Sequence, residues 1–422
     1  MRASSHATSG PCARRSGDRL STETRTAALE RPEPPPGLSP PPGHPRFPLV
    51  DGLRAIAALS VLLFHAATTS RASEAASGLG PYLARLNVGV AIFFAISGFL
   101  LYRPLLAARM GDGPPVRVRD YARRRALRIV PAYWVALTVL ALYPGLPGVF
   151  TGDWLVYYGF TQGYSPRTIV NGIGPAWTLG WELAFYALLP GLSAVFARIA
   201  RRGGRRASWP LELVVLGALA AAGVAYEAYA TRHPDALSAT FAGPFAWFAT
   251  GMLLALASVL GARAPGRATA ALNRFAWLGW PVALVAYWVI CRGLGLQGGF
   301  VFLQRQNTAQ TVAVVGLSGV LAAGLLLPAI FAGARHGPLG RLLASRPLAW
   351  LGLVSYGIYL YHEPLARVLN GGLASGGAPV RRFLLLAAGT AALAIAAGAV
   401  SYYVVERPAL RLGKRRRGGV RP

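Results

Sequence analysis

The sequence predicts an all-α protein, a polytopic membrane helix bundle of about ten transmembrane helices with both termini in the cytoplasm. Three observations lead to this fold class. The chain is 54% hydrophobic and only 14% charged, a composition too apolar for an ordinary soluble protein. Its 422 residues are also too many for a single membrane anchor. Apolar segments of membrane-spanning length recur along the chain. Loops rich in Lys and Arg alternate along the chain with loops that contain few of them.

Ten apolar segments follow one another. They span residues 49–68, 86–107, 129–147, 177–197, 210–229, 238–260, 275–292, 308–331, 348–369 and 382–405. We expect each to be a helix, because a bilayer offers no water to pair exposed backbone groups.

The distribution of basic residues predicts the orientation. With the N-terminus placed inside, 33 of the 43 Lys and Arg residues fall in cytoplasmic segments and eight in external ones. This bias is the positive-inside pattern. The net charge of +28 is therefore interpreted as a sign of topology, and no nucleic-acid partner is predicted. We expect a multi-pass protein of the inner or plasma membrane, in contact with membrane lipid.

The chain is expected to consist of one membrane domain and two tails. Residues 1–47 are rich in Pro, Ser, Arg and Gly and lack an apolar signal-peptide core, which predicts a disordered cytoplasmic tail. Residues 48–406 form the predicted membrane domain, and 407–422 form a basic cytoplasmic tail.

The first apolar segment carries two ionisable residues, Arg54 and His65. They are eleven residues apart, so on a helix they share one face and are separated by about 16 Å along the axis. Ionisable side chains at membrane depth cost about 2.5 to 3.5 kcal/mol or more each, and they usually face a bundle interior or a water-filled path. The alternative is an arginine that snorkels to the interface and a histidine bonded to a neighbouring helix.

Six short stretches together resemble the bacterial integral-membrane acyltransferase family 3, which includes O-antigen, peptidoglycan and macrolide O-acyltransferases. The stretches are D-G-L-R-A-I-A-A-L-S-V-L-L-F-H with its Arg-x10-His spacing, F-F-A-I-S-G-F-L (93–100), Y-A-R-R-R-A-L-R-I-V-P-A-Y-W (121–134), W-T-L-G-W-E-L-A-F-Y (177–186), S-Y-G-I-Y-L-Y-H (355–362) and S-Y-Y-V-V-E-R-P (401–408). Within the second, Ser97 and Gly98 are interpreted as helix-packing positions.

The resemblance implies transfer of an acyl group, often acetyl, from cytoplasmic acyl-CoA to a hydroxyl of a sugar, cell-surface glycan or secreted metabolite. Acyl-CoA would be a co-substrate, with no permanently bound cofactor. An alcohol needs a general base, and His65 is the candidate because the pKa of histidine lies near neutrality. Glu182 is expected near the outer helix ends, where it would orient His65, or else it bonds another helix.

A group of arginines near the cytoplasmic side is the candidate site for the CoA phosphates, with Arg54 at its inner edge. The others lie in the connection after the second segment: Arg124, Arg125, Arg128, Arg117 and Arg119. The second half of this connection is predicted to be a basic helix at the interface that then enters the bilayer. Topology alone also explains a basic loop here.

His362, Tyr356 and Ser355 are second-choice residues of the same cavity, although a packed, backbone-bonded histidine is the alternative for His362. No metal site is predicted, since the six histidines are scattered and no paired-cysteine spacing occurs. The rival function is a transporter or flippase of a glycan or lipid intermediate, because buried Arg, His and Glu also suit a transport path. The acceptor and the length of the acyl group stay open.

Overall fold

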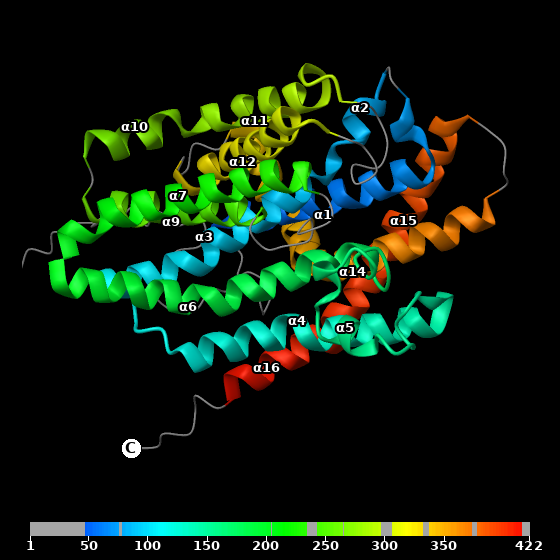
Figure 1. The fold of residues 1–422 in the computed structure, drawn as a ribbon, viewed down its shortest axis with the longest axis horizontal. Helices are drawn as coiled ribbons and strands as arrows, with labels where there is room; N and C mark the ends of the chain where they lie inside the picture. The colour runs from blue at the N-terminus through cyan, green and yellow to red at the C-terminus, as the bar shows by residue number, and fades with distance from the viewer. Residues whose placement is uncertain are drawn as a thin grey trace, which may run out of the picture. The chain divides into compact units, whose positions relative to one another are not determined.

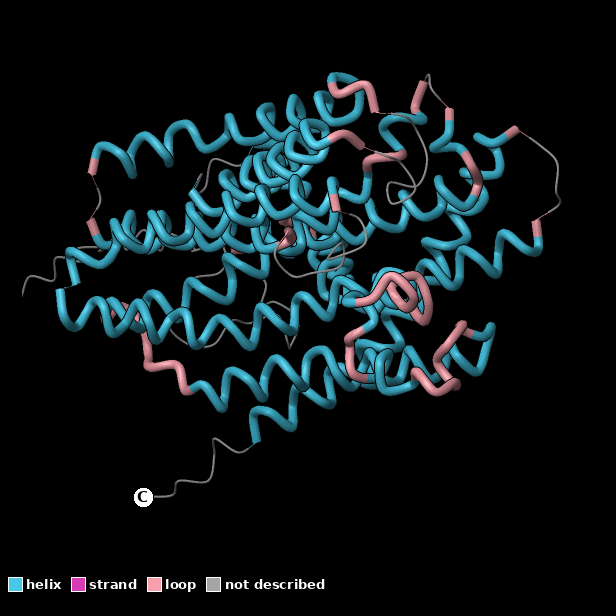
Figure 2. The backbone as a smooth tube through the Cα atoms, viewed as in Figure 1, coloured by secondary structure: helices cyan, strands magenta, loops and turns pink. Residues whose placement is uncertain are grey.

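The computed structural model describes residues 47–75, 78–203, 205–233, 243–264, 266–296, 306–331, 337–373 and 378–415. These residues all lie in one compact unit. Within these ranges the regular elements are all helices (Figure 2), which confirms the all-α fold class. The tail expected over 1–47 lies, except for Phe47, outside the described residues, as does the end of the chain from 416.

A helix occupies each of the ten predicted segments. In chain order these are α1 (Pro48–Thr69), α3 (Gly89–Met110), α4 (Val118–Leu140), α6 (Trp177–Gly203), α7 (Arg205–Arg232), α9 (Phe245–Arg263), α11 (Gly279–Trp288), α12 (Thr308–Phe331), α14 (Arg346–Gly372) and α15 (Pro379–Ser401). Shorter helices lie between or after them: α2 (Gly80–Leu83), α5 (Trp154–Tyr158), α10 (Arg267–Phe275), α13 (Gly337–Leu343) and α16 (Arg407–Arg415). Residues 238–242 of the sixth predicted segment lie outside the described part of the chain.

Length and composition qualify nine helical stretches of the described chain as membrane spans. The ninth predicted segment, α14, is a helix of 27 residues but is not one of these nine stretches. Its tyrosines, His362 and Glu363 reduce its apolar character, and both His362 and Glu363 are buried inside the bundle. The chain is therefore a multi-pass membrane protein, and the polar residues of α14 are shielded by the neighbouring helices.

Helix α4 contains the basic stretch that the sequence predicts to be helical. The basic stretch expected at the interface and the third predicted segment form one continuous helix that begins at Val118. Figure 1 shows α16 lying alongside the basic first half of α4, and the two helices are in contact. Because the helix is unbroken, its geometry fixes the direction in which each basic side chain points relative to the part of α4 that enters the bundle.

Helices α1 and α14 run in the same direction and pack closely. A Cβ at Gly352 of α14 would collide with the backbone oxygen of Asp51, so glycine is required for this approach. Arg54 of α1 contacts Ser355 of α14, and His65 lies beside His362 further along both helices.

Helices α1, α3, α9 and α12 bury more than half of their apolar stretch, whereas α6, α7 and α15 bury less than a third. The first group forms the core, and the second is left for lipid.

Candidate active site

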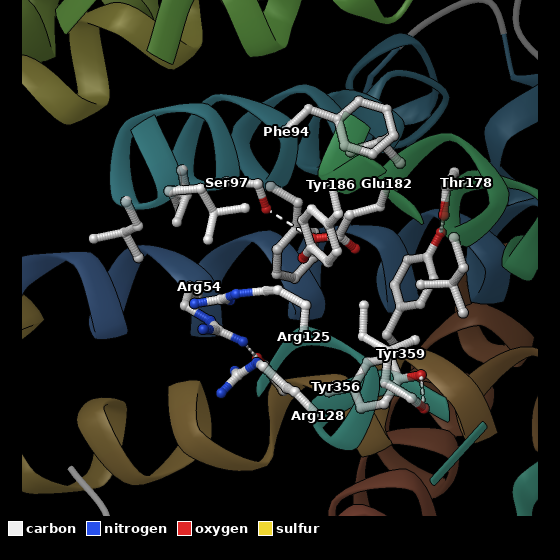
Figure 3. Close-up of a pocket in the computed structure, with 18 residues that line it drawn as sticks. Arg54, Phe94, Ser97, Arg125, Arg128, Thr178, Glu182, Tyr186, Tyr356 and Tyr359 are labelled. Atoms are coloured by element: carbon white, nitrogen blue, oxygen red, sulfur yellow. Dashed lines mark hydrogen bonds between the residues drawn. The ribbon is translucent and has the colours of Figure 1, made fainter. Parts of the chain in front are cut away.

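A cavity with an empty volume of about 770 Å³, its opening included, lies between α1, α3, α4, α6 and α14. Figure 3 shows the residues of its wall. They are Arg54, Val90, Phe93, Phe94, Ile96, Ser97, Leu100, Leu101, Arg125, Arg128, Ile129, Thr178, Leu179, Glu182, Tyr186, Ser355, Tyr356 and Tyr359. We call this space the arginine cavity.

Three of the predicted arginines, Arg54, Arg125 and Arg128, line this cavity, and their side chains lie close together in Figure 3. Arg54 donates a long hydrogen bond of 3.5 Å to Ser355 Oγ. The Nε atoms of Arg54 and Arg125 are buried and have no hydrogen-bond partner. A buried N–H without a partner is costly, and it indicates a site for an acceptor atom of a ligand.

The other three predicted arginines are placed differently. Arg117, Arg119 and Arg124 are exposed and do not belong to the cavity wall. Arg128 lies between Arg124 and Arg125 around the helix, and the bundle meets α4 on the side of Arg125. Any contact of the three exposed arginines with a ligand would therefore be made outside the cavity.

Glu182 lies in the wall of the arginine cavity, and its predicted meeting with His65 stays a prediction. Glu182 Oε1 accepts hydrogen bonds from Ser97 Oγ, at 2.8 Å, and from the Tyr186 hydroxyl. The point at which α6 begins sets this position. Its second residue, Thr178, is hydrogen-bonded to Tyr359 at 2.8 Å, one turn before His362 on α14.

The two predicted α14 residues of the cavity wall hold fixed positions. Tyr356 donates its hydroxyl hydrogen to Ile129 O at 3.0 Å, which ties α14 to α4. Ser355 is fully buried and donates to Gly352 O at 2.8 Å. Their contacts anchor the helix against the arginines.

A second polar group, which we call the histidine cluster, consists of His65, His362, Glu363 and Arg367. The ring centroids of His65 and His362 are 5.1 Å apart. Arg367 forms an ion pair with Glu363 one turn earlier. The cluster borders the arginine cavity through Tyr359, which lines the cavity and whose ring centroid is 5.7 Å from that of His362.

The sequence predicts the Ser355 and Tyr356 hydroxyls of the cavity but not its other hydroxyl groups. Ser97 was assigned to packing, yet it also bonds Glu182, and Thr178, Tyr186 and Tyr359 were not singled out as site residues. The i, i+4 spacing of Glu182 and Tyr186 is the one signal that could have paired them in advance. Among the described residues, no group of three or more His, Cys, Asp or Glu side chains is placed to hold a metal ion.

Comparison with known proteins places these observations in one family. The chain is 29% identical to the exopolysaccharide production protein ExoZ of Rhizobium meliloti over 84% of its length and 96% of that protein. It is 28% identical to the acyltransferase MdmB of Streptomyces mycarofaciens over 89% of its length and 95% of that protein. With the peptidoglycan O-acetyltransferase OatA of Listeria monocytogenes it shares 24% identity over 75% of its length.

The chain spans about half the length of OatA, 49% of that protein. No solved structure matches the chain. The model of the family described as "Acyltransferase domain" matches residues 47–403, most of the chain and all the residues of the two polar groups described above. The chain therefore belongs to this acyltransferase family, the one that its six motifs resemble.

Proposed function

We propose that this protein is a membrane O-acyltransferase that moves an acetyl group from acetyl-CoA to a hydroxyl of a sugar, cell-surface glycan or secreted metabolite. Membership of the acyltransferase family and the similarity to OatA and MdmB support acyl transfer to oxygen. The protein would act in the plasma membrane with its donor on the cytoplasmic side, as the positive-inside distribution suggests.

The observation that carries the donor assignment is the set of three arginines facing one cavity, two of them with buried unpartnered N–H groups. Guanidinium groups bind phosphates by charge-assisted and often bidentate hydrogen bonds. We assign the pyrophosphate of CoA to Arg54, Arg125 and Arg128. The exposed Arg117, Arg119 and Arg124 would attract the anionic nucleotide to the mouth of the site.

The pantetheine arm would then run along the cavity toward the histidine cluster. Eleven helical residues separate Arg54 from His65, about 16 Å along α1. An extended chain that begins at the arginines can therefore deliver its thioester past Tyr359 to His65. The hydroxyl oxygen of the acceptor attacks the thioester carbonyl carbon and gives its proton to His65. The carbon–sulfur bond breaks, and the CoA thiolate leaves and takes the proton from the imidazolium.

Glu182 would act within the arginine cavity in this mechanism. It is held by Ser97 and Tyr186 and contributes the negative charge of a wall that carries three arginines. Such a charge moderates the attraction between the cavity and the CoA phosphates, which favours release of the product CoA.

The test uses the full chain in sealed vesicles of both orientations, with acetyl-CoA outside and a glycan acceptor either inside or outside. We expect free CoA to appear only when an acceptor is present, with acyl transfer to acceptor on the side opposite to CoA. Acylation only of acceptor on the same side as CoA would refute transfer across the bilayer. Acceptor movement without acetyl-CoA, coupled to an ion gradient, would favour the transporter reading instead.

A further inference from the structure

The histidine cluster contains two buried hydrogen-bond acceptors that the fold leaves without a partner. They belong to successive residues of α14: Nε2 of His362 and Oε2 of Glu363. His362 is fully buried and Glu363 is 6% exposed. Buried acceptors are satisfied in nearly all proteins, so two adjacent ones beside a candidate base require an explanation.

The hydrogen bond at the other ring nitrogen defines what His362 can offer. Its Nδ1 lies 3.2 Å from the backbone oxygen of Ile358. A carbonyl oxygen only accepts, so Nδ1 must carry the hydrogen of this bond. In the neutral ring Nε2 then has a free lone pair, and it can bind only a donor group.

Glu363 is arranged in the same sense. One carboxylate oxygen pairs with Arg367, and the side chain of Arg367 is half-exposed. The other oxygen, Oε2, faces Gly174, where an added Cβ would lie 3.4 Å from it. The absence of a side chain at Gly174 leaves this oxygen uncovered by the loop that precedes α6.

Hydroxyl groups are the donors that complement these two atoms. A carboxylate oxygen and a neutral imidazole nitrogen repel phosphate and other anions at short range, and the half-neutralised Glu363 offers no strong site for a cation. A compound that carries several hydroxyls on neighbouring carbons can present one to the reacting base and others to fixed acceptors.

Resting on the proposed function, we propose that His362 and Glu363 form the acceptor subsite of the enzyme and select polyols. One hydroxyl of the acceptor gives its proton to His65, while neighbouring hydroxyls donate hydrogen bonds to His362 Nε2 and Glu363 Oε2. The subsite thus specifies a sugar-like acceptor with adjacent hydroxyls over a simple alcohol, because a monohydroxyl compound leaves both buried acceptors unpaired.

The test compares cyclohexanol with trans-cyclohexane-1,2-diol as acceptors for the full chain in lipid vesicles with acetyl-CoA, and the ester is quantified by mass spectrometry. In the unchanged protein we expect kcat/KM for the diol to exceed that for cyclohexanol about tenfold or more, the effect of one hydrogen bond to a charged group. The Glu363→Gln and His362→Phe variants, the second of which keeps a ring of similar volume, should lose most of this preference. The ratio of kcat/KM for the two alcohols should fall toward about two, because the diol has two equivalent hydroxyls and cyclohexanol has one.

Two further variants separate hydrogen bonding from structural effects. Arg367→Gln breaks the ion pair but keeps the carboxylate, so it should retain the diol preference. Glu74→Gln is the matched control, since Glu74 forms an exposed pair with Arg71 away from the cluster. A diol preference that persists in both Glu363→Gln and His362→Phe, or that is absent from the unchanged protein, overturns the subsite. Failure of the folded, unchanged protein to esterify either alcohol or to release CoA overturns the proposed function itself.

Discussion

Helices α1 and α14 contribute to both the arginine cavity and the histidine cluster, yet the two groups leave opposite kinds of atoms unpaired. In the cavity wall, the buried unpartnered atoms are the Nε donors of Arg54 and Arg125. In the histidine cluster, they are the acceptors of His362 and Glu363. Donors with positive charge suit phosphate, and acceptors suit hydroxyls. Under the proposed function, the arginine cavity would hold the anionic donor and the histidine cluster the neutral acceptor.

The parallel packing of α1 and α14 explains how both groups arise together. Arg54 meets Ser355, and eleven residues later His65 meets His362. Tyr359 lies between the two levels and is fixed by bonds of 2.8 Å to Thr178 and 2.9 Å to Pro175 O. The two polar groups thus share Tyr359 as a common wall.

Replacing His65 should have the largest effect, because the proposed mechanism places the general base in the histidine cluster. We expect His65→Ala to lower acceptor-dependent release of CoA by about 10² to 10⁴-fold, the range of general-base catalysis, with little change in KM for acetyl-CoA. Release of CoA by the purified variant in vesicles measures this.

His233→Ala is the matched control for that variant. His233 is exposed, stacks on Tyr229 and lies outside both polar groups, so its replacement should leave turnover unchanged. Full activity of His65→Ala would remove His65 from the base role and leave the histidine cluster without a catalytic function.

Replacing a cavity arginine should affect binding of the donor and leave the chemistry intact. We expect Arg125→Ala to raise KM for acetyl-CoA about tenfold to 100-fold, because it removes a charge-assisted hydrogen bond. Arg124→Ala, one position earlier but exposed, should have a clearly smaller effect.

Arg201→Ala at the exposed end of α6 controls for the loss of a surface charge. The three KM values, measured at two salt concentrations, separate a built phosphate site from general attraction by a basic surface. Equal effects at Arg124 and Arg125 would mean that the surface and not the cavity binds CoA.

The sequence predicts much of the fold and a part of the site, for identifiable reasons. Apolar length located the ten helices, and helical periodicity placed Arg54 and His65 on one face, because both depend on a single segment. The level of Glu182 depends on how the chain from 148 to 176 folds inward before α6, and no periodic pattern encodes that. The choice between Arg124 and Arg125 likewise needs the neighbours of α4, since Arg128 lies between them around the helix.

Replacing Glu182 tests whether the two polar groups are chemically separate. Glutamine keeps an oxygen that can accept from Ser97 and Tyr186 but removes the negative charge near the proposed phosphate site. We therefore expect Glu182→Gln to lower KM for acetyl-CoA about threefold to tenfold, with a small change in kcat. A loss of kcat as large as that of His65→Ala, with KM unchanged, would show that Glu182 serves the histidine cluster after all.

Moving α14 away from its neighbours should disturb both polar groups at once, with the smallest effect on turnover. Gly357 lies on α14 between Tyr356 and Tyr359, and a Cβ there would come within 2.5 Å of the Cα of Gly398 on α15. We expect Gly357→Ala to lower the free energy of unfolding by about 1 to 3 kcal/mol, the cost of overpacking, as measured by thermal unfolding in detergent. Gly316→Ala in α12, where an added Cβ meets nothing within 4 Å, should instead stabilise the protein by about 0.5 to 1 kcal/mol.

If Gly357→Ala raised KM for acetyl-CoA and for the acceptor together, α14 would be the element that couples the two sites. A change in only one of them would mean that the arginine cavity and the histidine cluster adjust independently.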